Sequence, residues 1–318
     1  MEAQRIVIVG AGEMGSGIAQ KFAMQGTAVD LVDLDVEILK RSLDRVRENL
    51  KTLVEARYLS EEQAEQVLPR IQPGCDLQIA GDSRFVLESV TENLESKREL
   101  FRRLDEICPP DAVLATNTSS LSIQRIAAAT RRPQQVIGCH LVNPPYLIPL
   151  VEVVRGEVTS QETVERCVGL LRGVGVVPAV CRRDVPGFVI NRIQWAIQGE
   201  LLALVERGVL DLEDADNVVW LALGARLALF GPLRINDLAA DKRLTLHGFE
   251  RMYRESGDPR FKPSDLLREK VAQGALGIKT GKGWYDYPGK SYERLKKDRD
   301  LALARIIRFL RDEGFYPR

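Results

Sequence analysis

The sequence predicts an α/β fold, with an N-terminal doubly wound sheet followed by a mostly α-helical C-terminal domain. Short apolar runs alternate with longer amphipathic segments up to about residue 185, which is the pattern of β/α units on a parallel sheet. After Asp184-Val185-Pro186-Gly187, helical periodicity continues without comparable apolar runs. The length of 318 residues also exceeds the size at which one core usually keeps growing. We therefore expect two domains, residues 1–186 and residues 187–318.

The elements of the first domain follow from hydrophobic periodicity. The predicted strands are Arg5–Val9, Val29–Val32, Phe85–Ser89, Ala112–Thr116 and Val136–Gly138. The predicted helices between them are Met14–Gln25, Val36–Glu55 and Glu95–Ile107. Ser60 followed by Gln63 forms a capping box that predicts one more helix start. In the second domain, Phe188–Glu206 and Glu213–Leu223 are expected to be helices.

Composition excludes several classes of partner. The 45 basic and 45 acidic residues balance, so no net field attracts nucleic acid or a membrane surface. The longest apolar stretch, Val218–Leu233, contains Arg226 and is too short to span a bilayer. The five cysteines show no C-x-x-C spacing, which is typical of reduced thiols. With no signal-peptide pattern in MEAQRIVIVG, we expect a cytoplasmic protein.

A glycine motif predicts a dinucleotide site. Gly10, Gly12 and Gly15 form G-x-G-x-x-G between the first strand and the first helix, where small residues let the backbone and helix N-terminus approach a pyrophosphate. The second strand ends at Asp33, about 20 residues after the motif, where an acid can bind the adenine ribose hydroxyls. Asp33 would repel a 2′-phosphate, and the next two residues supply no cation. The pattern therefore favours NAD over NADP, in a Rossmann-type domain.

One histidine and one glutamate stand out in residues 138–154, GCHLVNPPYLIPLVEVV. If Leu150–Val154 is a strand, Glu152 is either an exposed edge residue or a buried acid with a dedicated partner. His140 is the candidate partner, because a carboxylate can set the tautomer and orientation of an imidazole. From the residues alone, a pair and two unrelated side chains both remain open. With two distant histidines and no cysteine cluster, we expect no metal site.

Five segments occur in an order and spacing typical of one enzyme family. They read GAGEMGSGIAQ, ENLESKRELFRRLD, NTSSLSI, HLVNPPYLIPLVEVV and DVPGFVINRI. Together with GKGWYDY at residues 281–287, they resemble the L-3-hydroxyacyl-CoA dehydrogenase family, which includes the λ-crystallin/L-gulonate 3-dehydrogenase branch. The resemblance covers nearly the whole chain up to Tyr287.

The resemblance implies an NAD-dependent oxidoreductase and roles for particular residues. His140 and Glu152 would be the catalytic pair, with His140 as the base for the hydroxyl proton while hydride leaves carbon. Ser119 and Asn191 would bind the substrate oxygen, and Asn143 would support the same site. The positions that match the family's cofactor crevice are Met14, Glu92, Lys97 and Asn117.

The form of the substrate stays open between two branches of the family. The GKGWYDY and NTSSL segments are closer to the acyl-CoA enzymes, whereas HLVNPPYLIPLVE and Arg226 are closer to enzymes of free 3-hydroxy acids. An arginine fork matches a carboxylate, so Arg226 is a candidate for binding a free acid of the L-gulonate or carnitine type, against the alternative of a solvated or interface arginine. A non-catalytic, crystallin-like NAD-binding protein is a further alternative. By the resemblance, we also expect a homodimer formed through the helical half.

Overall fold

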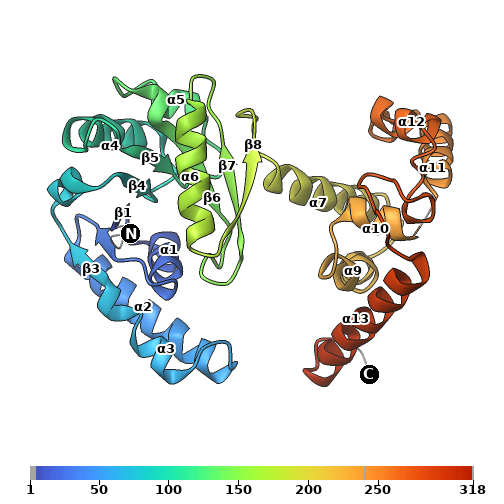
Figure 1. Ribbon diagram of the computed structural model, residues 1–318, viewed down its shortest axis with the longest axis horizontal. Coiled ribbons are helices and arrows are strands. Elements are labelled where there is room, and N and C mark those ends of the chain that lie inside the picture. Colours follow the sequence, from blue (N-terminus) through green and yellow to red (C-terminus); the bar gives the residue numbers. More distant parts are fainter. Residues whose placement is uncertain (1–4, 240, 317–318) are drawn as a thin grey trace. The chain divides into compact units, whose positions relative to one another are not determined.

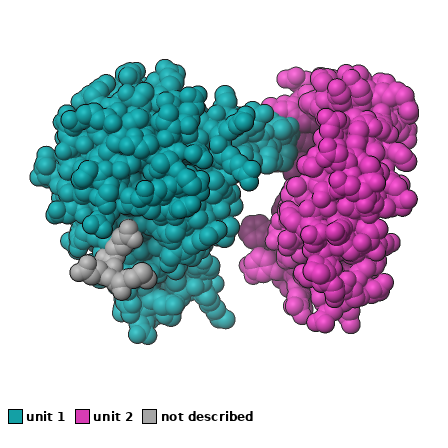
Figure 2. All heavy atoms as spheres, turned by 45° about the horizontal axis from the view of Figure 1, so that its top comes forward, with its two compact units in different colours: residues 1–198 teal, residues 199–318 magenta. Residues whose placement is uncertain are grey.

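The computed structural model describes residues 5–239 and 241–316, and the chain forms two compact units, residues 1–198 and 199–318 (Figure 1, Figure 2). The units divide within helix α7 (Ile190–Glu206). The boundary expected after residue 186 lies just before this helix and stays a prediction.

The first unit is built on an eight-stranded sheet in the order β3-β2-β1-β4-β5-β6-β7-β8. Its strands are β1 (Ile6–Val9), β2 (Val29–Val32), β3 (Ile71–Gly74), β4 (Phe85–Glu88), β5 (Val113–Thr116), β6 (Val136–Leu141), β7 (Leu150–Val154) and β8 (Val177–Cys181). Neighbouring strands are parallel except β6 and β7, which are antiparallel. Residues 142–149 join these two strands, and a connection this short cannot make a parallel crossover.

Helices cover both faces of this sheet, as a doubly wound fold requires. They are α1 (Glu13–Met24), α2 (Val36–Glu55), α3 (Glu61–Glu65), α4 (Leu94–Ile107), α5 (Ile123–Ala127) and α6 (Gln161–Gly173). Helices α1, α2 and α6 pack with one face in a cluster that contains Ile6 and Ile8. Helices α4 and α5 pack with the other face in a cluster that contains Val7 and Val9. Alternate residues of β1 therefore belong to opposite layers, and the predicted fold class is confirmed.

Strands β3 and β8 were not predicted from the sequence, for physical reasons. Strand β3 reads IQPG, in which proline and glycine are poor strand formers, and strand β8 reads VPAVC at the edge of the sheet with mostly exposed or half-exposed residues. The expected helix start at Phe188 was also wrong. Gly187 and Phe188 have φ angles of 76° and 49°, in the left-handed region, and α7 begins only at Ile190.

The second unit is helical, as expected. After the C-terminal part of α7 it contains α8 (Leu212–Asn217), α9 (Ala225–Leu227), α10 (Pro232–Ala239), α11 (Lys242–Ser256), α12 (Asp265–Ala272) and α13 (Tyr292–Asp312), with a π-helical segment over Val218–Gly224. Its buried apolar cluster is small and contains Leu238, Ile278 and Tyr287. Within the described residues no single helix meets the length and hydropathy needed to cross a membrane, although the bent pair Leu212–Leu227 and Pro232–Leu238 does so on length and composition alone.

A buried carboxylate organises the GKGWYDY segment of this unit. Asp237 forms an ion pair with the fully buried Lys242 and accepts hydrogen bonds from the backbone N–H groups of Trp284 and Tyr285 at 3.0 and 3.2 Å. The hydroxyl of Tyr287 donates to the same carboxylate at 2.9 Å. Burial raises the pKa of Tyr287, helped by this hydrogen bond. The segment singled out in the sequence is thus tied to α10 and α11 through one side chain.

Candidate active site

The glycine loop between β1 and α1 has the geometry of a phosphate-binding turn. Gly10 has a φ of 102°, and a Cβ on Gly15 would overlap the carbonyl oxygen of Gly10, so the loop requires both glycines. Asp33 at the end of β2 accepts a hydrogen bond from the backbone N–H of Ala11 at 2.8 Å. A cavity of about 560 Å³ runs beside this loop, and Gly10, Gly12 and Asp33 contribute to its wall.

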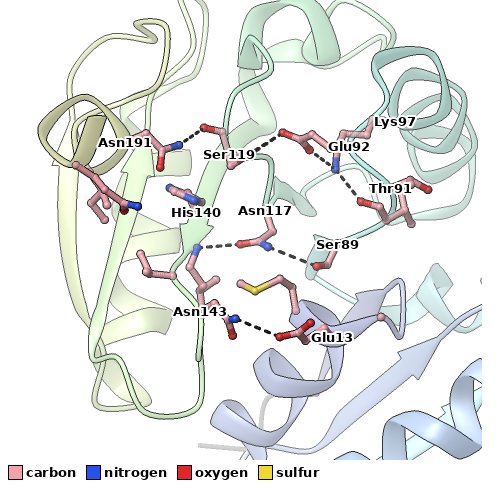
Figure 3. A pocket seen from close by; sticks show the side chains of 17 residues that line it. Glu13, Ser89, Thr91, Glu92, Lys97, Asn117, Ser119, His140, Asn143 and Asn191 are labelled. Atoms are coloured by element: carbon pink, nitrogen blue, oxygen red, sulfur yellow. Dashed lines mark hydrogen bonds and ion pairs between the residues drawn. The ribbon is translucent and has the colours of Figure 1, made fainter. Parts of the chain in front are cut away.

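A second cavity, of about 490 Å³, brings together most of the residues expected in the site (Figure 3). The expected residues that line it are Gly12, Met14, Glu92, Lys97, Asn117, Ser119, His140, Asn143 and Asn191. They come from α1, α4, α7 and the carboxyl ends of β4, β5 and β6, the edge at which ligands bind in open α/β sheets. The cavity is called the reaction cavity below.

The antiparallel register of β6 and β7 places His140 directly opposite Glu152. The Nδ1 atom of His140 lies 2.8 Å from Oε2 of Glu152, and both residues are buried. Since Nδ1 faces the carboxylate, the other ring nitrogen, Nε2, is left for the reaction cavity. The Phe188 ring packs against the imidazole, with centroids 5.7 Å apart.

Glu152 is held in its charged form by the start of α7. Its Oε1 atom accepts the backbone N–H groups of Val189 and Ile190, each at 2.9 Å. Burial alone would raise the pKa of Glu152, but the hydrogen bonds from His140, Ile190 and Val189 together lower it below its ordinary value. A buried, ionised carboxylate therefore faces the imidazole.

Lys97 of α4 is another residue that lines the reaction cavity. Its Nζ atom lies 2.5 Å from Oε1 of Glu88 and 3.3 Å from Oε2 of Glu92, and the Lys97 and Glu88 side chains are almost completely buried. Thr116 donates its hydroxyl to Glu88 at 2.6 Å. Burial raises the pKa of Glu88, although the positive charge of Lys97 acts to lower it. The sequence interpretation included Glu92 and Lys97 but missed Glu88, whose signal was a charge inside the apolar run FVLES.

Glu92 fixes the turn that carries Ser119. Its Oε1 atom accepts hydrogen bonds from the Thr118 hydroxyl at 2.6 Å and from the N–H and hydroxyl of Ser119 at 3.0 and 3.3 Å. Burial would raise the pKa of Glu92, but the Thr118 hydroxyl and the charge of Lys97 lead a set of interactions that lower it. Across the cavity, Asn191 donates its side-chain N–H to the carbonyl of Ser119 at 2.9 Å. The side chains of Glu92 and Asn191, from distant segments of the chain, therefore both hydrogen-bond to Ser119.

Two more amides complete the cavity wall. Asn117 accepts the backbone N–H of Leu141 at 2.8 Å, which ties the end of β5 to the end of β6. Asn143 donates its side-chain N–H to Oε1 of Glu13 at 3.1 Å. Neither Asn117 nor Glu13 could be paired with its partner from the sequence.

Arg226 belongs to the second unit and is not among the residues that line the reaction cavity. It lines a cavity of about 250 Å³ with apolar residues of α10 and with Arg299, Asp300 and Leu303 of α13. Its Nε donates to the carbonyl of Ala222 at 2.7 Å. Its role as a carboxylate ligand stays a prediction.

The fold and the glycine loop define a dinucleotide-binding protein, and comparisons with known proteins identify which kind. Residues 5–185 match the model of the 3-hydroxyacyl-CoA dehydrogenase NAD-binding domain, and residues 187–287 match the model of the C-terminal domain of the same enzymes. The chain belongs to the 3-hydroxyacyl-CoA dehydrogenase family. The family resemblance, the NAD cofactor and the class of oxidoreductase that acts on CH–OH groups are thereby confirmed.

Relatives cover nearly the full length of the chain. It is 39% identical to a probable 3-hydroxybutyryl-CoA dehydrogenase of Bacillus subtilis over 92% of this chain and 100% of that protein. It is 31% identical to the 5-formyl-3-hydroxy-2-methylpyridine 4-carboxylate 5-dehydrogenase of Mesorhizobium japonicum, over 96% and 98%. A crystal structure of a 3-hydroxyacyl-CoA dehydrogenase from Archaeoglobus fulgidus superimposes with a TM-score of 0.81 at 31% identity, covering 98% of this chain and 100% of that one.

Proposed function

We propose that this chain transfers hydride between C3 of a short 3-hydroxyacyl-CoA and NAD, with His140 as the acid/base group. The observation that carries the proposal is the buried His140–Glu152 pair, 2.8 Å apart, at the wall of the reaction cavity. The Bacillus subtilis relative, which is named a probable 3-hydroxybutyryl-CoA dehydrogenase, supports the choice of a short acyl group.

The residues of the glycine loop fit a dinucleotide. The loop has no side chain at the two positions where one would collide, and the carboxylate of Asp33 stands at the end of β2 beside the same cavity. Gly10, Gly12 and Gly15 would approach the pyrophosphate, and Asp33 would accept hydrogen bonds from the adenine ribose. When bound, NAD supplies the hydride acceptor, and the protein supplies orientation and proton transfer.

His140 is suited to take the proton of the substrate hydroxyl. Because its Nδ1–H donates to Glu152, Nε2 carries the lone pair and faces the cavity. As the imidazole becomes positively charged, the carboxylate of Glu152 stabilises it and keeps the ring in the same orientation. Ser119 and Asn191 would hydrogen-bond the substrate oxygen as it changes from hydroxyl to carbonyl. In the reverse direction, His140 returns the proton.

The test is a comparison of substrates with the purified protein. We expect NADH oxidation with acetoacetyl-CoA and little NAD reduction with L-3-hydroxybutyrate, L-gulonate or L-carnitine. Turnover of a free acid without turnover of the thioester would refute the acyl-CoA proposal while leaving the dehydrogenase class intact.

A second candidate substrate is a free hydroxy acid held by Arg226. Its support is the cavity that Arg226 shares with Arg299 in the second unit, and the Mesorhizobium japonicum relative, which is named for a pyridine carboxylate. For this candidate, Arg226→Ala would raise KM for the acid at least tenfold, because a bidentate arginine–carboxylate contact is lost. An unchanged KM would remove the candidate.

We propose that the protein is a homodimer formed through the helical unit. That unit buries few large apolar side chains, while Trp220, Leu223 and Leu227 are 42%, 38% and 40% exposed. Exposed apolar residues grouped along one stretch of chain are typical of interfaces. Sedimentation at micromolar concentration should give twice the mass of the chain, and a monomer would contradict the proposal.

We also propose a cytoplasmic location. All five cysteines are free thiols, three of them buried, which suits a reducing compartment. Cell fractionation should place the protein with cytoplasmic markers, and recovery in another fraction would overturn the assignment.

A further inference from the structure

One stripe of α1 holds the loop of residues 142–149, which carries Asn143. Glu13, Gly17 and Lys21 are spaced four residues apart and therefore lie on the same face of the helix. Each of them meets a different part of the loop, which is called the site loop below. The same helix begins at the glycine loop, so one rigid element contacts both the expected cofactor site and the site loop.

The three contacts are of different kinds. Oε1 of Glu13 accepts the side-chain N–H of Asn143 at 3.1 Å (Figure 3). A Cβ on Gly17 would lie 2.7 Å from Cγ of Pro145, so the loop packs directly on the helix backbone. Lys21 is 5% exposed and donates to the carbonyl of Tyr146 at 3.4 Å.

We propose that Glu13 is a positioning residue that sets the orientation of the Asn143 amide in the reaction cavity. An asparagine amide has a donor end and an acceptor end, and rotation by half a turn exchanges them. A carboxylate only accepts hydrogen bonds, so it selects the orientation in which Nδ2 faces Glu13. The Oδ1 atom of Asn143, at the other end of the amide, then always points away from Glu13 and is available to accept a hydrogen bond in the reaction cavity.

The placement of Glu13 separates this role from a role in folding. Glu13 is exposed and lies in the first turn of α1, whereas Gly17 and Lys21 are buried and support the loop itself. Both Glu13 and Asn143 line the reaction cavity. The inference rests on the proposed function, because Asn143 has a task only if that cavity is the reaction site.

The experiment compares Glu13→Ala with Glu13→Gln, because glutamine can still hydrogen-bond the loop but pairs with either end of the Asn143 amide. We expect kcat to fall about tenfold in both variants, the order of loss that follows when a site group is misplaced, because neither side chain selects one orientation of the Asn143 amide. Glu162→Ala is the matched control, since Glu162 is another exposed glutamate in a helix first turn, on α6. It should leave kcat unchanged.

A double variant tests whether Glu13 acts through Asn143. The kcat of Glu13→Ala/Asn143→Ala should equal that of Asn143→Ala alone, because the removed carboxylate then has no amide to orient. Losses that multiply would overturn the proposal, and so would a wild-type kcat in Glu13→Gln, because any hydrogen-bonding side chain would then suffice at this position.

A second readout needs no substrate. Hydrogen–deuterium exchange of peptides that cover residues 142–149 should be faster in Glu13→Ala than in wild type and in Glu13→Gln. Faster exchange combined with no turnover of any substrate by the wild type would support the positioning role and refute the proposed function. Exchange equal in all three proteins would overturn the positioning role, whatever the activity.

Discussion

The substitution Glu152→Gln isolates the charge of the carboxylate that faces His140. Glutamine has nearly the same shape and keeps one oxygen that can accept the N–H groups of Val189 and Ile190. Its amide end would then face Nδ1 of His140, which lies 2.8 Å from Oε2 in the native protein. Two N–H groups cannot hydrogen-bond each other, so the imidazole must change tautomer and move its proton to Nε2. The base would lose its lone pair on the cavity side.

The size of the effect follows from the lost ion pair. An imidazolium and a carboxylate whose charges lie about 4 Å apart attract each other by about 4 kcal/mol at an effective dielectric constant of about 20. Since about 1.4 kcal/mol corresponds to a factor of ten in rate, full loss of this attraction would lower kcat by about 10³. We expect a fall of about 10² to 10³, because local rearrangement recovers part of the energy.

Steady-state reduction of NAD with L-3-hydroxybutyryl-CoA, the direction in which His140 acts as the base, measures the effect, with KM and kcat determined separately. Glu157→Gln is the control, since Glu157 is an exposed glutamate shortly after the same strand. Because Glu152 is proposed to stabilise the charged imidazole, kcat should fall while KM changes little. A kcat within about threefold of wild type would refute the role given to Glu152.

Three further predictions concern stability and cofactor binding. The pKa of Glu152 is lowered from 4.5 in the folded state, so its contribution to the free energy of unfolding should be present above about pH 4.5 and lost as the pH falls through the lowered value. In urea titrations, Glu152→Gln should weaken this pH dependence of the free energy of unfolding. A pH profile identical to that of the wild type would contradict the prediction. Asp237→Ala should lower the free energy of unfolding of the helical unit by about 3–5 kcal/mol, because Lys242 is left buried and unpaired, and a loss under about 1 kcal/mol would show that the network is dispensable. Gly15→Ala should raise the Kd for NADH at least about tenfold by fluorescence titration, because its Cβ would overlap the carbonyl oxygen of Gly10; unchanged affinity with native circular dichroism would remove the glycine loop from the cofactor site.

The sequence predicted the doubly wound sheet because its central strands are continuous apolar runs with clear turn signals between them. It did not predict β3 or β8, since an edge strand needs little apolar character and both contain proline. The antiparallel turn between β6 and β7 was also absent from the expectation of a parallel sheet. The two missed strands lie at the edges of the sheet, where hydrophobic periodicity carries the least information.

The candidate site shows a similar division. Parity along a strand left Glu152 as either an exposed edge residue or a buried acid with a partner, and only the register of β6 and β7 places it opposite His140. The family resemblance identified Glu92 and Lys97, whereas the closer ion pair of Lys97 is with Glu88. Contacts such as Glu13 with Asn143 join residues far apart in the chain. No local pattern encodes them, because they depend on how two separate segments pack.

The measurement that tests the central claim most directly is single-turnover hydride transfer by wild type and His140→Gln. Each protein is saturated with NADH, mixed rapidly with acetoacetyl-CoA, and followed by the loss of NADH absorbance. With the proton donor removed, the rate of the chemical step should fall by about 10² to 10⁴ while the Kd for NADH stays the same. A His140→Gln rate close to that of the wild type would contradict the account, because the acid/base group would then have to be another residue.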